Sequence, residues 1–401
     1  MKNQYLPLYK LLCLFFLLMF VETSSLQATE NFRNFRFRQL STSDGLSTND
    51  IQQVYQDKEG YIWMATRNGL AKYNGYEMKI YKSNIYNWNL LGNNNISCIE
   101  EDTKHRIWIG TYDGLNVLDK VTGKIKQINK TEFSNNAISK ILVTRKGQIL
   151  LGTDQGLYQY IPERDSCVLF TRETTKDVMP QTSVKSLLED SKGNIWIGTW
   201  NEGLYRYDPE EGKYFAYPKM NERKSAHVVF EDSHHQIWVG TWEGGLFLLK
   251  NPYDMERVSW DVFRNEPAVE SSLADNTIYA LSEDRNTNSL WVGTRSGLSI
   301  LPYGTTSFVN YYPDESGHSI SGNEVTSMIC DQQGMMWLST LGGGVTAIIT
   351  RELNFALDHL ENIKKVFKTN SVRNILVDDE GLMWLSIGTY GLVVYNRQTG
   401  E

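Results

Sequence analysis

Residues 190–199, with the sequence DSKGNIWIGT, are followed by Gly203 and Leu204 and decide the fold of this chain. The stretch contains a polar turn, a short apolar run with one tryptophan, a Gly-Thr exit, and a second tight turn that opens a new apolar run. Short, continuous apolar runs bounded by glycine and polar turn residues are typical of buried β-strands. The stretch therefore predicts a β-hairpin whose strands are covered on both faces.

The same pattern occurs eight times along the chain. Its central position, which is tryptophan in every copy except the third, recurs at intervals of 45, 42, 46, 42, 53, 46 and 47 residues. The eight positions are Trp63, Trp108, Leu150, Trp196, Trp238, Trp291, Trp337 and Trp384. A near-constant period of this length indicates a propeller or a solenoid built from small modules.

Each repeat contains enough sequence for four strands, which we call a, b, c and d. In the fourth repeat they are predicted at residues 184–188, 195–199, 203–207 and 214–217. Four strands in about 45 residues form one blade of a β-propeller. The tryptophan of strand b offers a large contact area between blades, and the glycine after it permits close backbone approach. The sequence therefore predicts an all-β propeller.

The number of blades in the ring stays open at this point. The eighth repeat has Ile387 where the others have threonine, and the sequence ends at Glu401, after strand c of that repeat. We therefore predict a seven-bladed propeller over residues 29–355 and the first, incomplete blade of a second propeller over residues 356–401. One eight-bladed propeller is the alternative, and residues 35–40 are a candidate closing strand.

The first 28 residues differ from the rest of the chain. Lys2 and Lys10 precede an apolar run from Leu11 to Val21, and Ala28 ends a region of small and polar residues. This order is typical of a secretory signal peptide. The apolar run of roughly eleven residues is shorter than the ~20 that span a bilayer. We therefore expect residues 1–28 to direct export.

Charge and cysteine content exclude several classes of partner and site. The chain has 40 Lys and Arg residues against 47 Asp and Glu, a formal net charge of −7, and no basic cluster. This balance argues against nucleic acid or anionic lipid as a partner. Cys98, Cys167 and Cys330 lie in different repeats without the spacing of zinc or redox pairs, and we predict that they are buried thiols.

No pattern in the sequence indicates catalytic residues, a metal site or a cofactor. His234 and His235 are adjacent in one polar turn, where neighbours rarely converge on a single metal ion. Carboxylates such as Glu189 and Asp190 recur with the repeats, which favours turn capping. An asparagine before strand a recurs in the same way, at Asn49, Asn94, Asn136, Asn276, Asn323 and Asn370. These recurring polar residues are therefore assigned to turns.

The loops between strands b and c vary from repeat to repeat, unlike the uniform turns between a and b. In an antiparallel blade the b–c and d–a loops emerge on one side, so the variable loops share a face. Aromatic rings beside charged groups suit a sugar, whose C–H face stacks and whose hydroxyls take charge-assisted hydrogen bonds. The predicted oligosaccharide site consists of Arg67, Tyr112, Asp113, Trp200, Glu202, Trp242, Glu243 and Arg295. The alternative is that Trp200 and Trp242 only pack neighbouring loops.

The pattern D-x-x-G-x-I-W-I-G-T-x-x-G-L resembles the two-component regulator propeller repeat. Residues 40–51, LSTSDGLSTNDI, together with Gly60, Trp63 and Thr66, are similar to the start of the sensor region of hybrid two-component proteins of gut Bacteroidetes. The resemblance covers residues 35–401. It implies an N-terminal fragment of a longer protein that continues with a second propeller, a β-sandwich, a membrane helix, a histidine kinase and a response regulator.

The resemblance also implies a function. It is that of a periplasmic, ligand-sensing region that recognises glycan-derived oligosaccharides and regulates polysaccharide utilisation by phosphorelay. Kinase activity and inner-membrane anchoring would belong to parts outside this chain, and a homodimer of the full-length protein stays open. A secreted glycan-degrading enzyme on the same fold and a protein interaction scaffold are the alternatives, since a fold does not fix a function.

Overall fold

The computed structural model describes residues 35–84, 86–87, 90–128, 137–170, 181–217, 225–314, 319–350, 372–378 and 380–396. The predicted signal peptide, residues 1–28, lies outside these ranges, as do residues 356–371 of the predicted second domain. The chain divides into two compact units, Met1–Arg351 and Glu352–Glu401. Each unit is described by itself.

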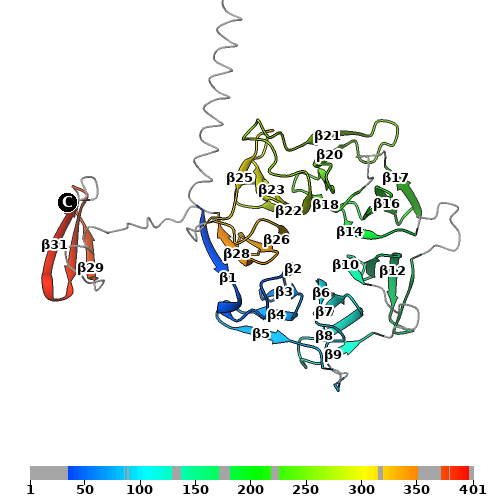
Figure 1. Cartoon of the computed structure of the whole chain (residues 1–401), viewed down its shortest axis with the longest axis horizontal. Coiled ribbons are helices and arrows are strands. Elements are labelled where there is room, and N and C mark those ends of the chain that lie inside the picture. The colour runs from blue at the N-terminus through cyan, green and yellow to red at the C-terminus, as the bar shows by residue number, and fades with distance from the viewer. Residues whose placement is uncertain are drawn as a thin grey trace, which may run out of the picture. The chain divides into compact units, whose positions relative to one another are not determined.

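The first unit is a ring of seven four-stranded antiparallel sheets, with their inner strands around a central channel (Figure 1). Six of the blades follow the chain in the predicted order a, b, c, d. Blades 1 to 3 are β2 (Ile51–Gln56), β3 (Ile62–Thr66), β4 (Gly69–Tyr73) and β5 (Met78–Tyr81); β6 (Ile96–Glu101), β7 (Arg106–Thr111), β8 (Gly114–Asp119) and β9 (Ile125–Gln127); and β10 (Ile138–Val143), β11 (Ile149–Thr153), β12 (Gly156–Ile161) and β13 (Ser166–Leu169).

Blades 4 to 6 repeat this arrangement. They are β14 (Val184–Glu189), β15 (Ile195–Thr199), β16 (Leu204–Asp208) and β17 (Lys213–Ala216); β18 (Val228–Glu231), β19 (Ile237–Gly240), β20 (Leu246–Lys250) and β21 (Ser259–Phe263); and β22 (Ile278–Asp284), β23 (Ser289–Thr294), β24 (Gly297–Leu301) and β25 (Val309–Tyr311). The b strands of blades 1, 3, 4, 5 and 6 are buried along their whole length. This agrees with the unbroken apolar runs from which they were predicted.

Blade 7 is completed from the other end of the ring. Its strands a to c are β26 (Val325–Cys330), β27 (Met335–Thr340) and β28 (Gly344–Ile349), and its outer strand is β1 (Arg36–Leu40). β1 pairs antiparallel with β28, from Arg36 opposite Ile349 to Leu40 opposite Val345 (Figure 1). The candidate closing strand therefore closes a seven-bladed ring, and the eight-bladed alternative is wrong.

The second unit contains one three-stranded antiparallel sheet. Its strands are β29 (Val372–Val377), β30 (Leu382–Ile387) and β31 (Gly391–Asn396). The helices of the described residues are two 3₁₀ turns, η2 (Thr42–Asp44) and η3 (Gly388–Tyr390). The prediction of an all-β propeller followed by a further blade-like sheet is confirmed.

In most blades a hydrogen bond links the aspartate of the polar turn to the tryptophan six residues later. In blade 4, Asp190 Oδ2 accepts a bond of 2.7 Å from Trp196 Nε1, and Asp190 Oδ1 accepts from the backbone N–H groups of Lys192 and Asn194. The same indole bond occurs in blades 1, 2, 5 and 7 and in the second unit, at 2.7–2.9 Å. The aspartate thus caps the turn and orients the tryptophan.

Two blades depart from this rule, each for a visible reason. Blade 3 has Thr144 and Leu150 at the two positions, so the acceptor and the indole are absent together. Blade 6 has one residue more between Asp284 and Trp291, and the buried Trp291 Nε1 group has no hydrogen-bond partner among the residues that the structure describes. Asp284 accepts instead from the Thr287 hydroxyl at 2.8 Å.

The carboxylates before these aspartates join neighbouring blades. Glu231 of blade 5 accepts bonds of 2.6 Å from the backbone N–H and the hydroxyl of Ser191 in the turn of blade 4. Glu189 accepts in the same way from the Arg145 N–H of blade 3. The recurring Asn94 and Asn276 accept backbone N–H groups at the d–a connections. These bonds confirm the turn roles predicted for the repeated carboxylates and for Asn94 and Asn276, whereas Asn136 and Asn370 lie outside the described residues.

The glycine of strand b lies where the inner strand of the next blade comes close. A Cβ atom on Gly198 would be 2.4 Å from the Ala226 carbonyl oxygen, and one on Gly240 would be 2.5 Å from Ile278 Cγ2. Any side chain at these points would push two blades apart. This confirms the close approach predicted for these glycines.

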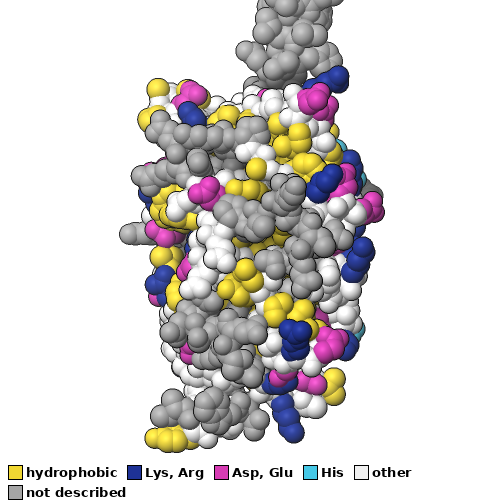
Figure 2. All heavy atoms as spheres, turned by 90° about the vertical axis from the view of Figure 1, so that its right-hand side faces the viewer, with side chains coloured by type: hydrophobic (Ala, Val, Ile, Leu, Met, Phe, Trp, Pro, Cys, Tyr) yellow, Lys and Arg dark blue, Asp and Glu magenta, His cyan; other side chains and the backbone are white. Residues whose placement is uncertain are grey.

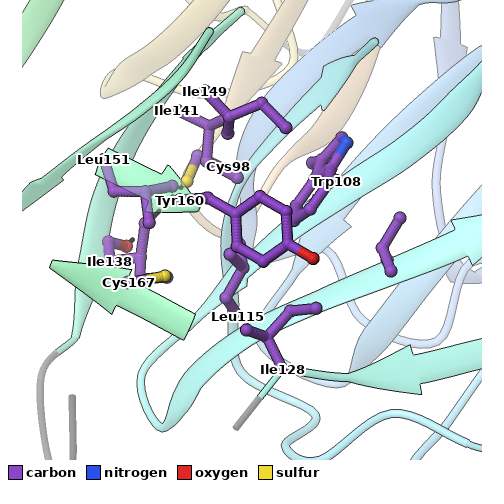
Figure 3. Close-up of a cluster of buried hydrophobic side chains, with 11 residues drawn as sticks. Cys98, Trp108, Leu115, Ile128, Ile138, Ile141, Ile149, Leu151, Tyr160 and Cys167 are labelled. Atoms are coloured by element: carbon purple, nitrogen blue, oxygen red, sulfur yellow. Dashed lines mark hydrogen bonds between the residues drawn. The ribbon is translucent and has the colours of Figure 1, made fainter. Parts of the chain in front are cut away.

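The spaces between blades hold the hydrophobic core. Between blades 2 and 3, Trp108 packs against Tyr160 with ring centres 4.8 Å apart (Figure 3). Cys98 and Cys167 belong to the same cluster and are buried, as predicted (Figure 3). Cys330 is only half-buried, because it ends strand a beside the polar turn, and the prediction of a fully buried thiol is wrong there.

Candidate binding site at the channel mouth

The predicted site residues all lie in loops between strands b and c, at one rim of the ring. They are Arg67 between β3 and β4, Tyr112 and Asp113 between β7 and β8, Trp200 and Glu202 between β15 and β16, Trp242 and Glu243 between β19 and β20, and Arg295 between β23 and β24. These loops share a face because every blade is an antiparallel meander that begins at the channel. Whether they bind a ligand stays a prediction.

The structure brings two of these residues together. The rings of Trp200 and Trp242 meet edge to face with centres 5.1 Å apart, although they belong to blades 4 and 5. His227 lies 6.1 Å from Trp200 and 6.0 Å from Trp242. Tyr279 of blade 6 completes the group, 5.9 Å from Trp242 and 5.7 Å from His227. We call Trp200, His227, Trp242 and Tyr279 the aromatic cluster.

The remaining predicted residues are distributed around the rim, in loops of different blades. Tyr112 is 51% exposed. The Arg295 guanidinium is 3.4 Å from the Asp275 carboxylate, within its own blade. Glu243 follows Trp242 directly and has a left-handed backbone with φ of 59°, which is uncommon for a residue other than glycine. The candidate site is therefore centred on blades 4 to 6.

A cavity of about 180 Å³ lies directly beneath the aromatic cluster, in the central channel. The inner strands of the blades form its wall, and Lys185, His227 and Tyr279 belong to both the wall and the surroundings of the cluster. The Lys185 ammonium is 5.9 Å from the centre of the Trp200 ring. A partly exposed aromatic surface is thus continuous with a polar cavity.

His227 is the neutral member of the cluster. Burial, and to a smaller extent the nearby Lys185 charge, lowers the pKa of His227 to about 4. Its Nδ1 atom is buried and has no hydrogen-bond partner among the described residues. At neutral pH the cluster therefore offers an uncharged imidazole with an unused ring nitrogen at the channel wall.

The folding free energy should depend on His227 below neutral pH. The unfolded chain binds a proton near pH 6.5 and the folded protein only near pH 4, so acidification through this window favours unfolding. A shift of this size corresponds to a loss on the order of 3 kcal/mol by pH 4. We expect His227→Phe to reduce the fall in unfolding free energy between pH 7 and pH 4, measured by urea denaturation. An identical fall in both proteins would contradict the buried, neutral state of His227.

Sequence reasoning missed Lys185, His227 and Tyr279. They occupy the same place in three successive repeats, directly after Val184, Ala226 and Ile278. Aligning the repeats on strand a would have placed them at one level of the channel. Their residue types vary while the position before each stays apolar, which is the signal that was available.

A second, larger cavity of about 850 Å³ lies at the opposite face, beside the a–b turns of blades 3 and 4. Its buried Arg206 already has partners, because its guanidinium donates to Asn194 and Tyr217 and lies over the Phe215 ring at 4.2 Å. These contacts give Arg206 a structural role beside Trp196. The channel mouth therefore remains the better candidate for a ligand.

Three further observations bear on function. Among the described residues, no group of three or more His, Cys, Asp or Glu side chains is placed to hold a metal ion. His234 and His235 are exposed in their turn, as predicted, and His234 stacks on Tyr303 at 4.1 Å. A search of the described part of the chain found no helix with the length and apolar character needed to cross a membrane.

The charged side chains on the side of the ring around blades 3 and 4 lie intermixed (Figure 2). Lys213 and Glu211 of blade 4, for example, form an ion pair of 3.2 Å. The described residues visible on this side form no large area of one sign.

The profile of the family described as "two component regulator propeller" matches five segments of the chain. They are residues 45–68, 90–113, 179–201, 272–296 and 319–342. The segments correspond to blades 1, 2, 4, 6 and 7, and each contains strands a and b and ends in the b–c loop. The matched unit is therefore the repeat that carries the polar turn and the tryptophan.

A similar protein of known annotation is histidine kinase P4 of Formosa agariphila. It is 28% identical over 370 residues, which cover 78% of this chain and 26% of the kinase. The chain thus spans about a quarter of the length of that relative.

Similar solved structures include two extracellular domains from B. thetaiotaomicron that are described as parts of hybrid two-component systems. Both have a TM-score of 0.65; one is 18% identical and covers 91% of this chain and 54% of its own, and the other is 23% identical and covers 90% and 46%. An inactive variant of virginiamycin B lyase from Staphylococcus aureus has a TM-score of 0.60 at 11% identity, covering 79% and 99%. At such low sequence identities the structural similarity shows the fold alone. A sensor domain and an enzyme can share this fold.

Proposed function

Since this chain belongs to the two-component regulator propeller family, we propose that it is the extracytoplasmic sensing region of a histidine kinase and recognises an oligosaccharide. The observation that carries the proposal is the aromatic cluster at the channel mouth. Export to the periplasm, phosphorelay through a kinase outside this chain, and control of polysaccharide utilisation belong to the same proposal. The similarity to the kinase of Formosa agariphila supports the signalling part.

The geometry of the cluster suits a sugar ring. Trp200 and Trp242 are both half-buried, so part of each residue remains accessible while the contact between their rings holds the pair together. Indole faces stack on the apolar C–H face of a pyranose, and this contact needs little rearrangement of a rigid aromatic pair. Glu202 and Glu243 are exposed beside the two tryptophans, where carboxylates accept hydrogen bonds from sugar hydroxyls.

Rigidity also connects binding to signalling. The tryptophans emerge from two blades that are joined by the Glu231–Ser191 bonds and by a shared apolar core. A ligand that contacts both loops therefore touches a stiff body and not a mobile hairpin. A stiff sensor domain can pass a change of orientation to the parts that follow it.

The test is the affinity for a panel of neutral and acidic oligosaccharides of four to six sugars, measured by calorimetry. We expect Trp200→Ala and Trp242→Ala each to weaken binding of the best member about tenfold, which corresponds to ~1.4 kcal/mol. The matched control is Tyr303→Ala, which removes an exposed aromatic ring after strand c of blade 6, at the opposite face.

Circular dichroism and the unfolding midpoint show whether the variants remain folded. If the protein with both Trp200→Ala and Trp242→Ala folds and binds with unchanged affinity, the aromatic cluster is not part of the binding site. The absence of binding to every member of the panel would contradict oligosaccharide recognition by this chain. If Tyr303→Ala weakened binding as much as Trp200→Ala, the ligand would not bind specifically at the face that carries the aromatic cluster.

A further inference from the structure

Two lysines line the central channel below the aromatic cluster. Lys185 belongs to β14, and Lys140 belongs to the neighbouring inner strand β10. The described residues that line this cavity include no aspartate and no glutamate. In a chain with a net charge of −7, the channel is therefore a locally positive cavity. Such a cavity raises the local concentration of anions.

Other polar side chains of the wall are used to join the blades. The Ser139 hydroxyl donates to the Val184 carbonyl of the next blade, and the Thr326 hydroxyl donates to the Ile51 carbonyl at 2.7 Å. Gln53 bonds the backbone of the neighbouring inner strand through both ends of its amide. These bonds fix the wall and leave the long lysine side chains as its adaptable donors.

Lys185 connects the channel with the aromatic cluster. Its ammonium lies near the Trp200 ring and forms an ion pair of 2.9 Å with Asp154. The Asp154 side chain is 58% exposed, so solvent screens this pair and it contributes little to stability. An anion in the channel would give Lys185 a second and less exposed partner.

Lys140 lies near a carboxyl group whose charge is incomplete at neutral pH. Burial raises the pKa of Glu100 to about 7, against the opposing effects of the Lys140 charge and the Tyr55 hydrogen bond. Near pH 7 the Glu100 carboxyl is therefore only partly ionised. Burial of this carboxyl therefore weakens the counter-charge that Glu100 offers to Lys140.

We infer that the ligand is an acidic saccharide whose carboxylate or sulfate group enters the channel beside Lys140 and Lys185. Its sugar ring lies against Trp200 and Trp242, so the inference rests on the proposed function. The cavity of about 180 Å³ admits a compact anionic group or several waters, but not an oligosaccharide. Charge-assisted bonds to the two ammonium groups then select acidic sugars over neutral ones.

The experiment compares oligosaccharides of equal length that carry a uronate, a sulfate or no charge. Calorimetry at low ionic strength should show the acidic members binding about tenfold more tightly than the neutral ones. We expect Lys140→Met and Lys185→Met each to weaken the binding of acidic members towards the affinity of the neutral ones. The control is Lys192→Met, which removes an exposed lysine at the opposite face. The uronate and sulfate arms show which acidic group the channel accepts.

Crystals soaked in selenate locate the anion site independently of the sugar. An anomalous selenium peak in the channel of the unchanged protein, and none in Lys140→Met, is the expected result. Equal affinity for neutral and acidic members, or a preference that survives in both lysine variants, would overturn the inference. If neutral members still lose affinity with Trp200→Ala, the proposed function stands while the acidic specificity fails.

Discussion

Replacement of Asp190 by threonine is expected to lower the unfolding free energy by about 3 kcal/mol, because it leaves buried donors without an acceptor. Asp190 is fully buried and accepts from the Trp196 indole, from two backbone N–H groups and from the Tyr253 hydroxyl at 3.0 Å. Threonine can serve only part of this set. Urea denaturation followed by circular dichroism measures the loss.

The matched control is Asp284→Thr in blade 6. Asp284 also caps its turn and is also fully buried, but it does not bond the tryptophan of its blade. We therefore expect a clearly smaller loss there. Losses of equal size would mean that turn capping, and not the indole bond, is what the aspartate contributes.

A double-mutant cycle isolates the bond itself. Blade 3 shows that threonine and leucine are compatible at these two positions, because Thr144 and Leu150 occupy them there. The combined Asp190→Thr and Trp196→Leu exchange should therefore cost less than the sum of the single exchanges, by 1–3 kcal/mol. Strict additivity would show that the two side chains are independent.

The repeat pattern was sufficient to predict the blade but not all of its bonds. Strand positions, the buried tryptophan and the close approach at the glycine follow from local residue types and spacing. The Asp–Trp bond joins a residue of the polar turn to a residue of strand b. It is not apparent when the turn and the strand are considered separately. The sequence signal was the joint loss of both residues in blade 3, at Thr144 and Leu150.

Ring closure was left open because it depends on residues far apart in the chain. Arg36–Leu40 carries none of the marks of the repeat, and its partner strand begins more than three hundred residues later, at Gly344. Pairing between segments that far apart produces no periodic pattern in the local sequence. Only the three-dimensional arrangement shows that blade 7 lacks an outer strand until β1 supplies it.

The candidate site was predictable in its loops and not in its channel. Trp200 and Trp242 could be placed on one face because the b–c loops of an antiparallel blade emerge together. Lys185 and Tyr279 lie on inner strands and His227 directly precedes one, where a side chain faces either the channel or a neighbouring blade. Which of these it faces is settled only when the blades are arranged in a ring.

Leu40→Ala is expected to destabilise the ring at its closure, with a loss of about 3 kcal/mol. Leu40 is 2% exposed and ends β1, the strand that completes blade 7. Its side chain belongs to the apolar cluster between blades 7 and 1, together with Trp337 and Val345. The cavity left by the missing atoms would therefore weaken the outer strand and the contact between the first and last blades at once.

Amide hydrogen exchange shows where the loss occurs. We expect faster exchange in β1 and β28 and unchanged exchange in blades 3 and 4, since local opening follows the weakened sheet. Arg38→Ala is the control on the same strand, because its side chain is exposed and its removal leaves the β1–β28 ladder intact. A uniform rise in exchange over all seven blades would show that the ring opens as one unit. Unchanged exchange in β28 would show that β1 does not hold the ring closed.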